Sequence, residues 1–272
     1  MLEPEALMDT AVEIAREAGK LLMADLPLGR FRGDVENKGG RELVSRVDRA
    51  SEALVRKLVA EAHPDHAVFG EEEGASGDVA EAPYRWIVDP LDGTTNYLHG
   101  HPVFAVSIGV EALVGDEPGL VAGVVHAPYM SEVFCAARGV GAFLNSKTIR
   151  LEVSDTASLD EAILATGFAY DRDRWPNEQN FLRLLKDGLG IRRCGAAALD
   201  FAYVAAGRYD GFWEMGLRPW DVAAGALLVQ EAGGRLGTFV GEDGWLTSGN
   251  IIACNPHLFE AISSRLDPVP AG

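Results

Sequence analysis

Two carboxylates stand three positions apart in the stretch WIVDPLDGTTN at residues 86–96, directly after a short apolar run that is typical of a buried strand. They belong to Asp89 and Asp92. Glu71 follows a second short apolar run, and Asp221 lies further along the chain in RPWDVAAG. Because ligands of open α/β sheets bind outside the carboxyl ends of the strands, we expect these acids to converge. Mg²⁺ prefers oxygen ligands, and two such ions about 3.5–4 Å apart hold both the attacking and the leaving oxygen of a phosphoryl transfer.

The three residues that follow Asp92 suit a phosphate. Gly93 lets a ligand come close to the backbone, and Thr94 and Thr95 are predicted to open a short helix that ends near Gly100. Free N–H groups at the start of a helix bind phosphate, and a hydroxyl there can orient a water molecule. The stretch therefore predicts metal ligands and a phosphate site side by side.

Each of these motifs also has an ordinary structural explanation when it is taken alone. DPLDGT is typical of a turn whose threonine caps a helix. The run 71–73 is typical of a solvated loop, and Asp221 has the position of an acid in the first turn of a helix, where the helix dipole favours it. The catalytic interpretation depends on finding all of these motifs in one chain.

Helices and strands alternate along both halves of the chain. The spacing of apolar residues predicts helices at 5–22, 47–62, 177–188, 197–207 and 220–234, and a last helix with Asn255 at its N-cap and Pro256 at N1. Short apolar runs predict strands at 67–69, 84–89, 103–113, 119–129, 161–168, 191–195 and 210–215, two more within 132–149, and others near Leu236 and Ile251. This order predicts the mixed α/β (α+β) class with layered sheets and helices.

Further expectations concern the arrangement of these elements. The residues of the second helix that we expect to face inward are Val47, Ala50, Leu54 and Leu58. Residues 25–42 and 74–83 are expected to be loops because they are rich in glycine and charge. Residues 1–272 are expected to form a single domain, with an N-terminal half at about 1–155 and a C-terminal half at about 156–266.

Composition excludes several classes of function. The 272 residues carry a net charge of −17, so the surface repels nucleic acid and anionic membranes, and neither is an expected partner. The same charge repels a phosphorylated ligand, so a phosphate site needs local positive charge, which bound cations supply. The chain has no run of about 18 apolar residues and no basic, apolar signal segment, and its three cysteines are far apart. These features predict a cytoplasmic protein with free thiols.

Several stretches together resemble a known family. GEE at 70–72, WIVDPLDGTTN at 86–96 and PWDVAAGALLVQEAGG at 219–234 are similar to the signatures of the inositol monophosphatase family. LVSRVD at 43–48 and the final NIIACNP fit the family in the same order, so the resemblance covers nearly the whole chain. It implies a layered α-β-α-β-α sandwich of the sugar-phosphatase type and a homodimer.

The resemblance also implies two or three Mg²⁺ ions per site. The first ion is expected to be held by Glu71, Asp89 and the backbone carbonyl of Leu91. The second is expected to be held by Asp89, Asp92 and Asp221, so that Asp89 bridges the two ions. A third, weaker ion is expected near Glu71, coordinated mostly by water.

The same resemblance gives catalytic roles to Thr94, Asp48, Glu71 and Lys38. A water activated by the metal is expected to attack the phosphorus directly, without a phosphoenzyme. Thr94 is expected to orient this water, with Asp48 buried behind it as a hydrogen-bond partner. Lys38, followed by two glycines, matches a loop that closes near the metals.

Contacts with the substrate are implied for Asp92, Gly93, Thr94, Thr95, Gly195, Ala196, Ala197, Glu214 and Asp221. Among them, the backbone of residues 93–95 is expected to hold the phosphate. Glu214 is expected to read substrate hydroxyls, with residues 195–197 lining the same pocket. Two other acids of this half, Asp200 and Asp210, are expected to be structural.

The resemblance therefore implies a Mg²⁺-dependent phosphatase that cleaves inositol 1-phosphate and related sugar or polyol monophosphates and is inhibited by lithium. Histidinol-phosphate phosphatase and fructose-1,6-bisphosphatase use the same metal core and stay open as alternatives. The segment GFAYDRDRW at 167–175 departs from the animal-type enzymes, which weakens strict inositol specificity. Bisphosphate nucleotidase is disfavoured because Thr95 stands where that branch carries lysine. A regulatory binding partner with the family fold is the non-catalytic alternative.

Overall fold

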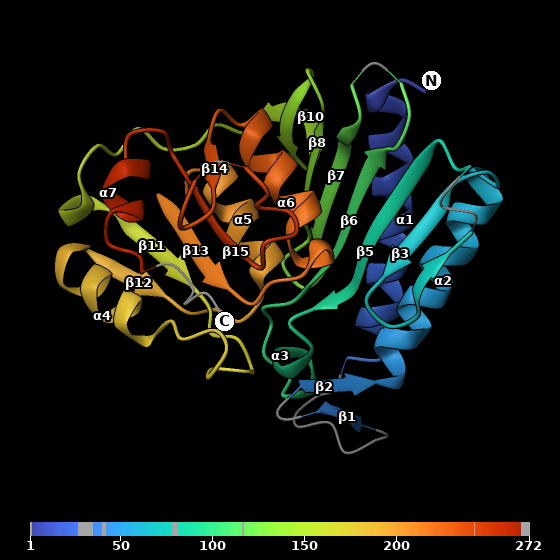
Figure 1. The fold of residues 1–272 in the computed structure, drawn as a ribbon. Coiled ribbons are helices and arrows are strands. Elements are labelled where there is room, and N and C mark those ends of the chain that lie inside the picture. The colour runs from blue at the N-terminus through green and yellow to red at the C-terminus, as the bar shows by residue number, and fades with distance from the viewer. Residues whose placement is uncertain are drawn as a thin grey trace.

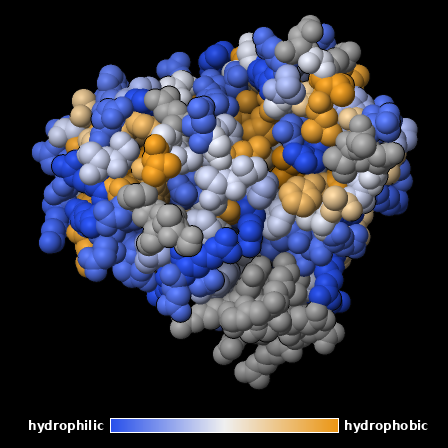
Figure 2. Space-filling model, viewed as in Figure 1, coloured by the Kyte–Doolittle hydropathy of each residue, from blue (hydrophilic) through white to orange (hydrophobic). Residues whose placement is uncertain are grey.

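Helices and sheets alternate in five layers across the molecule (Figure 1). The computed structural model describes residues 2–26, 35–39, 42–77, 81–115, 117–241 and 243–267. The predicted α-β-α-β-α sandwich is confirmed. The face seen in Figure 2 is mostly hydrophilic, and apolar side chains show only in small separate groups. Within the described ranges, no helix is long and apolar enough to cross a membrane.

Two long helices, α1 (Pro4–Ala24) and α2 (Arg46–Ala62), cover the outer face of the larger sheet. This sheet has eight strands in the order β10-β9-β8-β7-β6-β5-β3-β4, and only β3 and β5 pair in parallel. The strands are β3 (Ala67–Gly70), β4 (Gly74–Ser76), β5 (Tyr84–Asp92), β6 (Ala105–Ala112), β7 (Gly119–Ala127), β8 (Glu132–Ala137), β9 (Gly141–Leu144) and β10 (Ser146–Arg150). A buried apolar cluster fills the space between the two helices and the sheet.

The middle layer consists of α5 (Ala197–Ala205) and α6 (Pro219–Glu231), whose residues are mostly buried. Two glycines of the larger sheet allow α6 to pack closely against it. A Cβ on Gly109 in β6 would lie 2.6 Å from the Cβ of Ala223, and one on Gly123 in β7 would lie 2.8 Å from the carbonyl oxygen of Ala224. Because α6 is held against β6 and β7 in this way, the position of its first turn is fixed relative to the sheet.

The smaller sheet lies on the other side of the middle layer. Its five strands run in the order β12-β11-β13-β15-β14, and helices α4 and α7 cover its outer face (Figure 1). The bounds are β11 (Ile163–Thr166), α4 (Glu178–Asp187), β12 (Gly190–Arg192), β13 (Gly211–Met215), β14 (Arg235–Gly237), β15 (Asn250–Cys254) and α7 (Phe259–Ser263). A short helix, α3 (Thr94–Leu98), follows β5, and a separate hairpin joins β1 (Val35–Gly39) to β2 (Glu42–Ser45).

Several local expectations were wrong. The described part of residues 25–42 contains β1 and the start of β2, and 74–83 begins with β4. Residues 132–149 hold three strands because β10 folds back on β9. The last helix begins at Phe259, because the Asn255 Oδ1 atom accepts hydrogen bonds from the N–H groups of His257 at 3.0 Å and Leu258 at 3.2 Å and so caps a turn ahead of it.

The inward face of α2 is also rotated from the expected one. Ala50 is exposed and Leu54 is only partly buried. The buried residues are Val47, Asp48, Ser51, Glu52, Val55 and Val59. Three of these are polar, and each of the three hydrogen-bonds to a segment of the site described below. The buried face of α2 is therefore set by these hydrogen bonds, and the spacing of apolar residues does not predict them.

A stacked pair of histidines lies against Trp86 at the edge of the outer core. The ring centroids of His63 and His66 are 4.4 Å apart, and the indole Nε1 of Trp86 donates to His66 Nδ1 at 3.0 Å. The His66 side chain is only 2% exposed. Burial, reinforced by repulsion from His63, lowers the pKa of His66 from 6.5 to about 4.

We expect acid to destabilise the protein through this pair. His66 takes up a proton near pH 6.5 in the unfolded chain but only near pH 4 in the folded chain. The contribution of neutral His66 to the free energy of unfolding is therefore complete above pH 6.5 and is lost as the pH falls from 6.5 to 4. The loss should amount to about 1–3 kcal/mol. Urea unfolding across these pH values measures it. His66→Gln keeps an acceptor for Trp86 and should flatten the dependence, whereas equal pH dependence in both proteins would contradict the prediction.

Candidate active site

Asp89 faces the middle layer of the molecule. Side chains alternate along β5, with Trp86 and Val88 in the outer core and Ile87 in the core between the sheets. Asp89 shares the side of Ile87 and is 2% exposed. A bulge interrupts the pairing of β5 with β6 after Asp89, and there the N–H of Leu91 donates to Asp89 Oδ1 at 3.0 Å.

Glu71 lies beside Asp89 because their strands are parallel neighbours. Gly70 at the end of β3 pairs with Val88, and the N–H of Glu71 continues the ladder by donating to the Val88 carbonyl at 3.1 Å. The acidic residues that end the two strands therefore lie at the same edge of the sheet. This is the convergence expected from the sequence.

Asp92 and Asp221 complete the acidic group from opposite sides. Asp92 is 6% exposed, and its carboxylate accepts from the N–H groups of Ala197 at 3.1 Å and Ala198 at 2.8 Å, at the start of α5. Asp221 lies in the first turn of α6, where its Oδ2 accepts from the N–H of Arg218 at 2.7 Å. The backbone N–H groups at two helix starts thus orient both carboxylates.

The four acidic side chains repel one another strongly. Burial raises the pKa of Asp89 well above its ordinary value, and the charges of Glu71, Asp92 and Asp221 raise it further. Burial likewise raises the pKa of Asp221, with further contributions from Glu71 and Asp92. A bound cation would relieve this repulsion.

The donor set fits Mg²⁺. It consists of oxygen atoms alone, and Mg²⁺ typically takes one or two carboxylates together with water and substrate phosphate. As they stand, however, no three acidic, histidine or cysteine side chains within the described ranges form a group that could hold a metal ion, so the fit lies in the type of the donors and their mutual proximity. The carboxylates of Asp92 and Asp221 are partly engaged by backbone N–H groups, but each oxygen keeps a lone pair for a second contact.

The hydrogen bond expected between Thr94 and Asp48 is present. The Thr94 hydroxyl lies 2.8 Å from Asp48 Oδ1 and 3.0 Å from the carbonyl oxygen of Leu91. Asp48 is 1% exposed, and its Oδ2 accepts from the N–H of Ser45 at 2.9 Å and from the Ser45 hydroxyl at 2.5 Å. This capping box at the start of α2 holds the Asp48 carboxylate behind Thr94.

Gly93 is required by its surroundings as well as by its conformation. Its φ is +88°, in the left-handed region, and a Cβ there would lie 2.9 Å from the carbonyl oxygen of Val103. The same Cβ would lie 3.3 Å from the Gly195 carbonyl oxygen and from the Cβ of Ala196. The turn at residues 93–95, which is expected to hold the phosphate and is called the phosphate turn below, therefore packs directly on the segment expected to line the substrate pocket.

Two residues of α3, Asn96 and Thr95, contact the C-terminal half. The Asn96 side-chain amide donates to the carbonyl oxygens of Cys194 at 2.8 Å and Gly195 at 3.3 Å. Thr95 is exposed, and its hydroxyl lies 3.3 Å from the hydroxyl of Tyr170 in the segment that departs from the animal-type enzymes. Residues of that segment thus reach the rim of the candidate site.

Glu214 lies beside the site on β13, with its carboxylate packed over Gly167. Burial raises the pKa of Glu214 to about 8 against the lowering effect of Arg193. Asp200 in α5 is 1% exposed, and its Oδ1 has no hydrogen-bond partner among the described residues. Asp210 has the structural role expected for it, because its carboxylate accepts from the Ser154 hydroxyl and the N–H of Ile163.

The sequence model of the inositol monophosphatase family matches residues 3–269 of the chain. The chain belongs to the inositol monophosphatase family. The match spans both halves and includes every acidic residue discussed above.

Relatives in the inositol monophosphatase family carry two kinds of name. The chain is 43% identical over 272 residues to the Nus factor SuhB of Pseudomonas aeruginosa, with 97% of each chain covered. It is 42% identical over 269 residues to the inositol-1-monophosphatase of Synechocystis, with 97% of this chain and 91% of the relative covered. The crystal structure of the extragenic suppressor protein SuhB from Bartonella henselae matches with a TM-score of 0.86 at 40% identity and covers 96% of this chain and 98% of that one.

Sequence reasoning missed two residues that support the family's acidic site. Glu52 is fully buried, and its carboxylate accepts from the N–H groups of Glu72 at 2.7 Å and Glu73 at 3.0 Å, which holds the turn after β3. The Ser51 hydroxyl donates to the carbonyl of Pro90 at 2.9 Å and so holds the bulge after Asp89. Both are polar residues inside a helix, where a solvated position is the usual expectation. Lys38 belongs to β1, and its side chain lies outside the described part of the structure.

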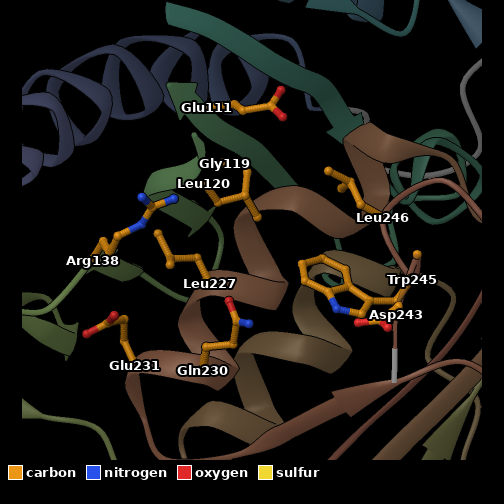
Figure 3. A pocket seen from close by; sticks show the side chains of 11 residues that line it. Glu111, Gly119, Leu120, Arg138, Leu227, Gln230, Glu231, Asp243, Trp245 and Leu246 are labelled. Atoms are coloured by element: carbon orange, nitrogen blue, oxygen red, sulfur yellow. The ribbon is translucent and has the colours of Figure 1, made fainter. Parts of the chain in front are cut away.

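A cavity of about 600 Å³ lies away from the acidic site of this family member, next to the last turns of α6 (Figure 3). Leu227 and the indole of Trp245 line it. Two of its acidic groups are engaged within the protein, since Glu111 pairs with Arg85 at 2.5 Å and Glu231 accepts from the N–H of Gly139 at 2.9 Å. Its size therefore does not make it a candidate for phosphate chemistry.

Proposed function

We propose that the protein is a Mg²⁺-dependent phosphomonoesterase that hydrolyses inositol 1-phosphate and related sugar or polyol monophosphates. The observation that carries this proposal is the convergence of Glu71, Asp89, Asp92 and Asp221 from separate elements beside the Thr94 hydroxyl. Asp89 and Asp92 are buried and Glu71 and Asp221 are partly buried, and close like charges of this kind suit a bound cation. Membership of the inositol monophosphatase family supports the same reaction class.

We propose the two groups of ligands that the family resemblance implies. Glu71, Asp89 and the Leu91 carbonyl would hold one ion, and Asp89, Asp92 and Asp221 would hold a second. When bound, Mg²⁺ offsets the charge of the phosphate and lowers the pKa of water. Asp89 would belong to both groups.

Thr94 is proposed to orient the attacking water. Its hydroxyl has one proton, and both oxygens within reach of that proton, on Asp48 and Leu91, are acceptors. The hydroxyl oxygen is therefore left to accept a hydrogen bond from a water molecule. The buried Asp48 carboxylate keeps the Thr94 proton directed away from that water, and it is itself held by Ser45.

The substrate is proposed to lie between the two halves of the chain. Its phosphate would be held by the backbone N–H groups of residues 93–95, where Gly93 keeps the surface free of a side chain. Its alcohol portion would then point toward residues 195–197 and Glu214. A carboxylate there suits the hydroxyl groups of a polyol, which donate hydrogen bonds.

Phosphate release from a panel of substrates tests the function. We expect Mg²⁺-dependent turnover of inositol 1-phosphate that EDTA abolishes, added Mg²⁺ restores and lithium inhibits. Histidinol phosphate and fructose 1,6-bisphosphate belong in the panel, and a clear preference for either would keep the metal mechanism and change the substrate. The control is circular dichroism in EDTA, which should show a folded protein. Turnover that EDTA leaves unchanged would refute the metal requirement.

A second candidate function comes from the relatives that are named Nus factor SuhB. We propose as the alternative that the chain acts as a regulatory binding partner of the kind those names describe. The variant Asp89→Asn separates the two, because it removes an acidic ligand without changing the surface. Loss of turnover with an unchanged cellular phenotype favours the binding partner, and loss of both favours the enzyme.

A further inference from the structure

Arg193 lies at the rim of the proposed substrate pocket. It follows β12, and its guanidinium folds over Gly195, since a Cβ on Gly195 would lie 3.0 Å from Arg193 Nη1. Gly195 is the residue whose carbonyl oxygen packs against Gly93 of the phosphate turn. The cationic group is therefore separated from the proposed phosphate site only by the backbone of one glycine.

The side chain of Arg193 is exposed and forms no contact with an acid among the described residues. No hydrogen bond or ion pair joins it to any residue that the structure describes. Other arginines of the molecule are engaged with carboxylates, for example Arg85 with Glu111 and Arg208 with Glu132. Five N–H donors of Arg193 thus remain available to a ligand.

The charge of Arg193 reaches the acids on the alcohol side of the pocket. It lowers the pKa of Glu214 and of Asp200, against the larger raising effect of burial on both. The charges of these acids therefore lie within range of the guanidinium, although neither forms an ion pair with it. The proposed pocket therefore combines the carboxylates of Glu214 and Asp200, which suit hydroxyl donors, with the guanidinium of Arg193, which suits an anion.

We propose that Arg193 is a specificity-determining residue that selects substrates whose alcohol portion carries a second anionic group, such as a second phosphate. The proposal rests on the phosphomonoesterase function proposed above. With the reacting phosphate on residues 93–95, the alcohol extends over Gly195 toward Glu214. An anion at its far end then meets the planar guanidinium, which binds phosphate or carboxylate through paired N–H groups.

The same pocket offers a competing chemistry, which the test must separate. Asp200 is buried with an unpartnered Oδ1, and together with Glu214 it would suit an alcohol that carries an ammonium group. Such a substrate would be repelled by Arg193. Removing the guanidinium would therefore weaken the binding of an anionic substrate and strengthen the binding of a cationic one.

The experiment compares fructose 1,6-bisphosphate with fructose 1-phosphate, which differ only in the second phosphate. For Arg193→Gln we expect kcat/KM with the bisphosphate to fall about ten- to a hundredfold, mainly through KM. Fructose 1-phosphate should change by no more than about twofold, because it makes no contact with the guanidinium. Arg193→Lys keeps the charge and should recover part of the loss.

Arg192→Gln is the matched control. Arg192 is the preceding residue and is also exposed, but its guanidinium folds over Gly190, where a Cβ would lie 3.1 Å from Arg192 Nη1. This variant should leave the ratio of the two substrates unchanged.

Several results would overturn the proposal. One is an equal loss for both fructose esters in Arg193→Gln, and another is an unchanged KM for the bisphosphate. A changed molar mass in solution with an unchanged substrate ratio would assign Arg193 to a contact between copies of the chain. Faster turnover of histidinol phosphate by Arg193→Gln, with no effect on the bisphosphate, would assign the pocket to cationic substrates. If the wild type cleaves no phosphomonoester with Mg²⁺, the proposed function itself fails, and this inference fails with it.

Discussion

Replacing Asp89 with asparagine is expected to lower kcat for phosphate release at least about a thousandfold, because this carboxylate belongs to both proposed groups of metal ligands. Asparagine keeps the size of the side chain and an oxygen that can accept from the N–H of Leu91. It also removes the buried Asp89 carboxylate from a group in which Asp92 is buried and Glu71 and Asp221 are partly buried. In EDTA, the variant should therefore have a free energy of unfolding equal to or above that of the wild type.

This pairing of results separates a lost ligand from a damaged fold. Steady-state phosphate release with Mg²⁺ measures the first, and urea unfolding in EDTA measures the second. Glu73→Gln is the control, since Glu73 is on the same turn as Glu71 but its side chain is 56% exposed and outside the acidic group. Its activity should stay within about twofold of the wild type. Activity of Asp89→Asn within tenfold of the wild type would be incompatible with the proposed site.

Thr94→Val should lower kcat about a hundredfold while changing KM little, because valine has nearly the shape of threonine but cannot orient a water. Thr94→Ser restores a hydroxyl at the same place and should recover most of the rate. The loss of the donor to Asp48 should also cost about 1–2 kcal/mol of unfolding free energy, since that carboxylate is buried. Kinetics and urea unfolding of both variants measure these effects.

The role of Asp48 can be tested in the same series. If Asp48 acts by directing the Thr94 proton, then Asp48→Asn should add little to the loss that Thr94→Val already causes, as a double-mutant cycle would show. Additive losses would mean that the two residues act independently. A Thr94→Ser variant as slow as Thr94→Val would show that the hydroxyl is not the group that matters.

The positions of Asp89, Asp92 and Glu71 could be predicted because each lies within four residues of the end of a short apolar run. Strand ends can be predicted from local sequence, and the last residues of neighbouring parallel strands lie at one edge of the sheet. The place of Asp221 at the start of α6 was equally local. The meeting of the acids was expected from the general rule that ligands bind at the carboxyl ends of strands, whereas the assignment of each acid to an ion came from the family resemblance.

The supports of the site were not predictable from those patterns. Apolar spacing placed the inward face of α2 on Ala50 and Leu54, whereas the structure buries Ser51 and Glu52. Their partners lie about twenty and forty residues away, at Glu72 and Pro90, so nothing near them in sequence marks the contact. A buried polar residue that serves a remote turn has the same local signature as a solvated one.

The contact of Asp92 with the start of α5 has a consequence for how the protein is made. During synthesis, β5 leaves the ribosome long before Ala197 and Ala198, whose N–H groups orient the Asp92 carboxylate, and before Asp221. The growing chain thus carries Asp89 and Asp92 through most of its translation without the groups that complete the acidic site. A chain that ends before residue 197 therefore lacks the N–H groups that orient Asp92, and one that ends before residue 221 also lacks the fourth acid of the candidate site.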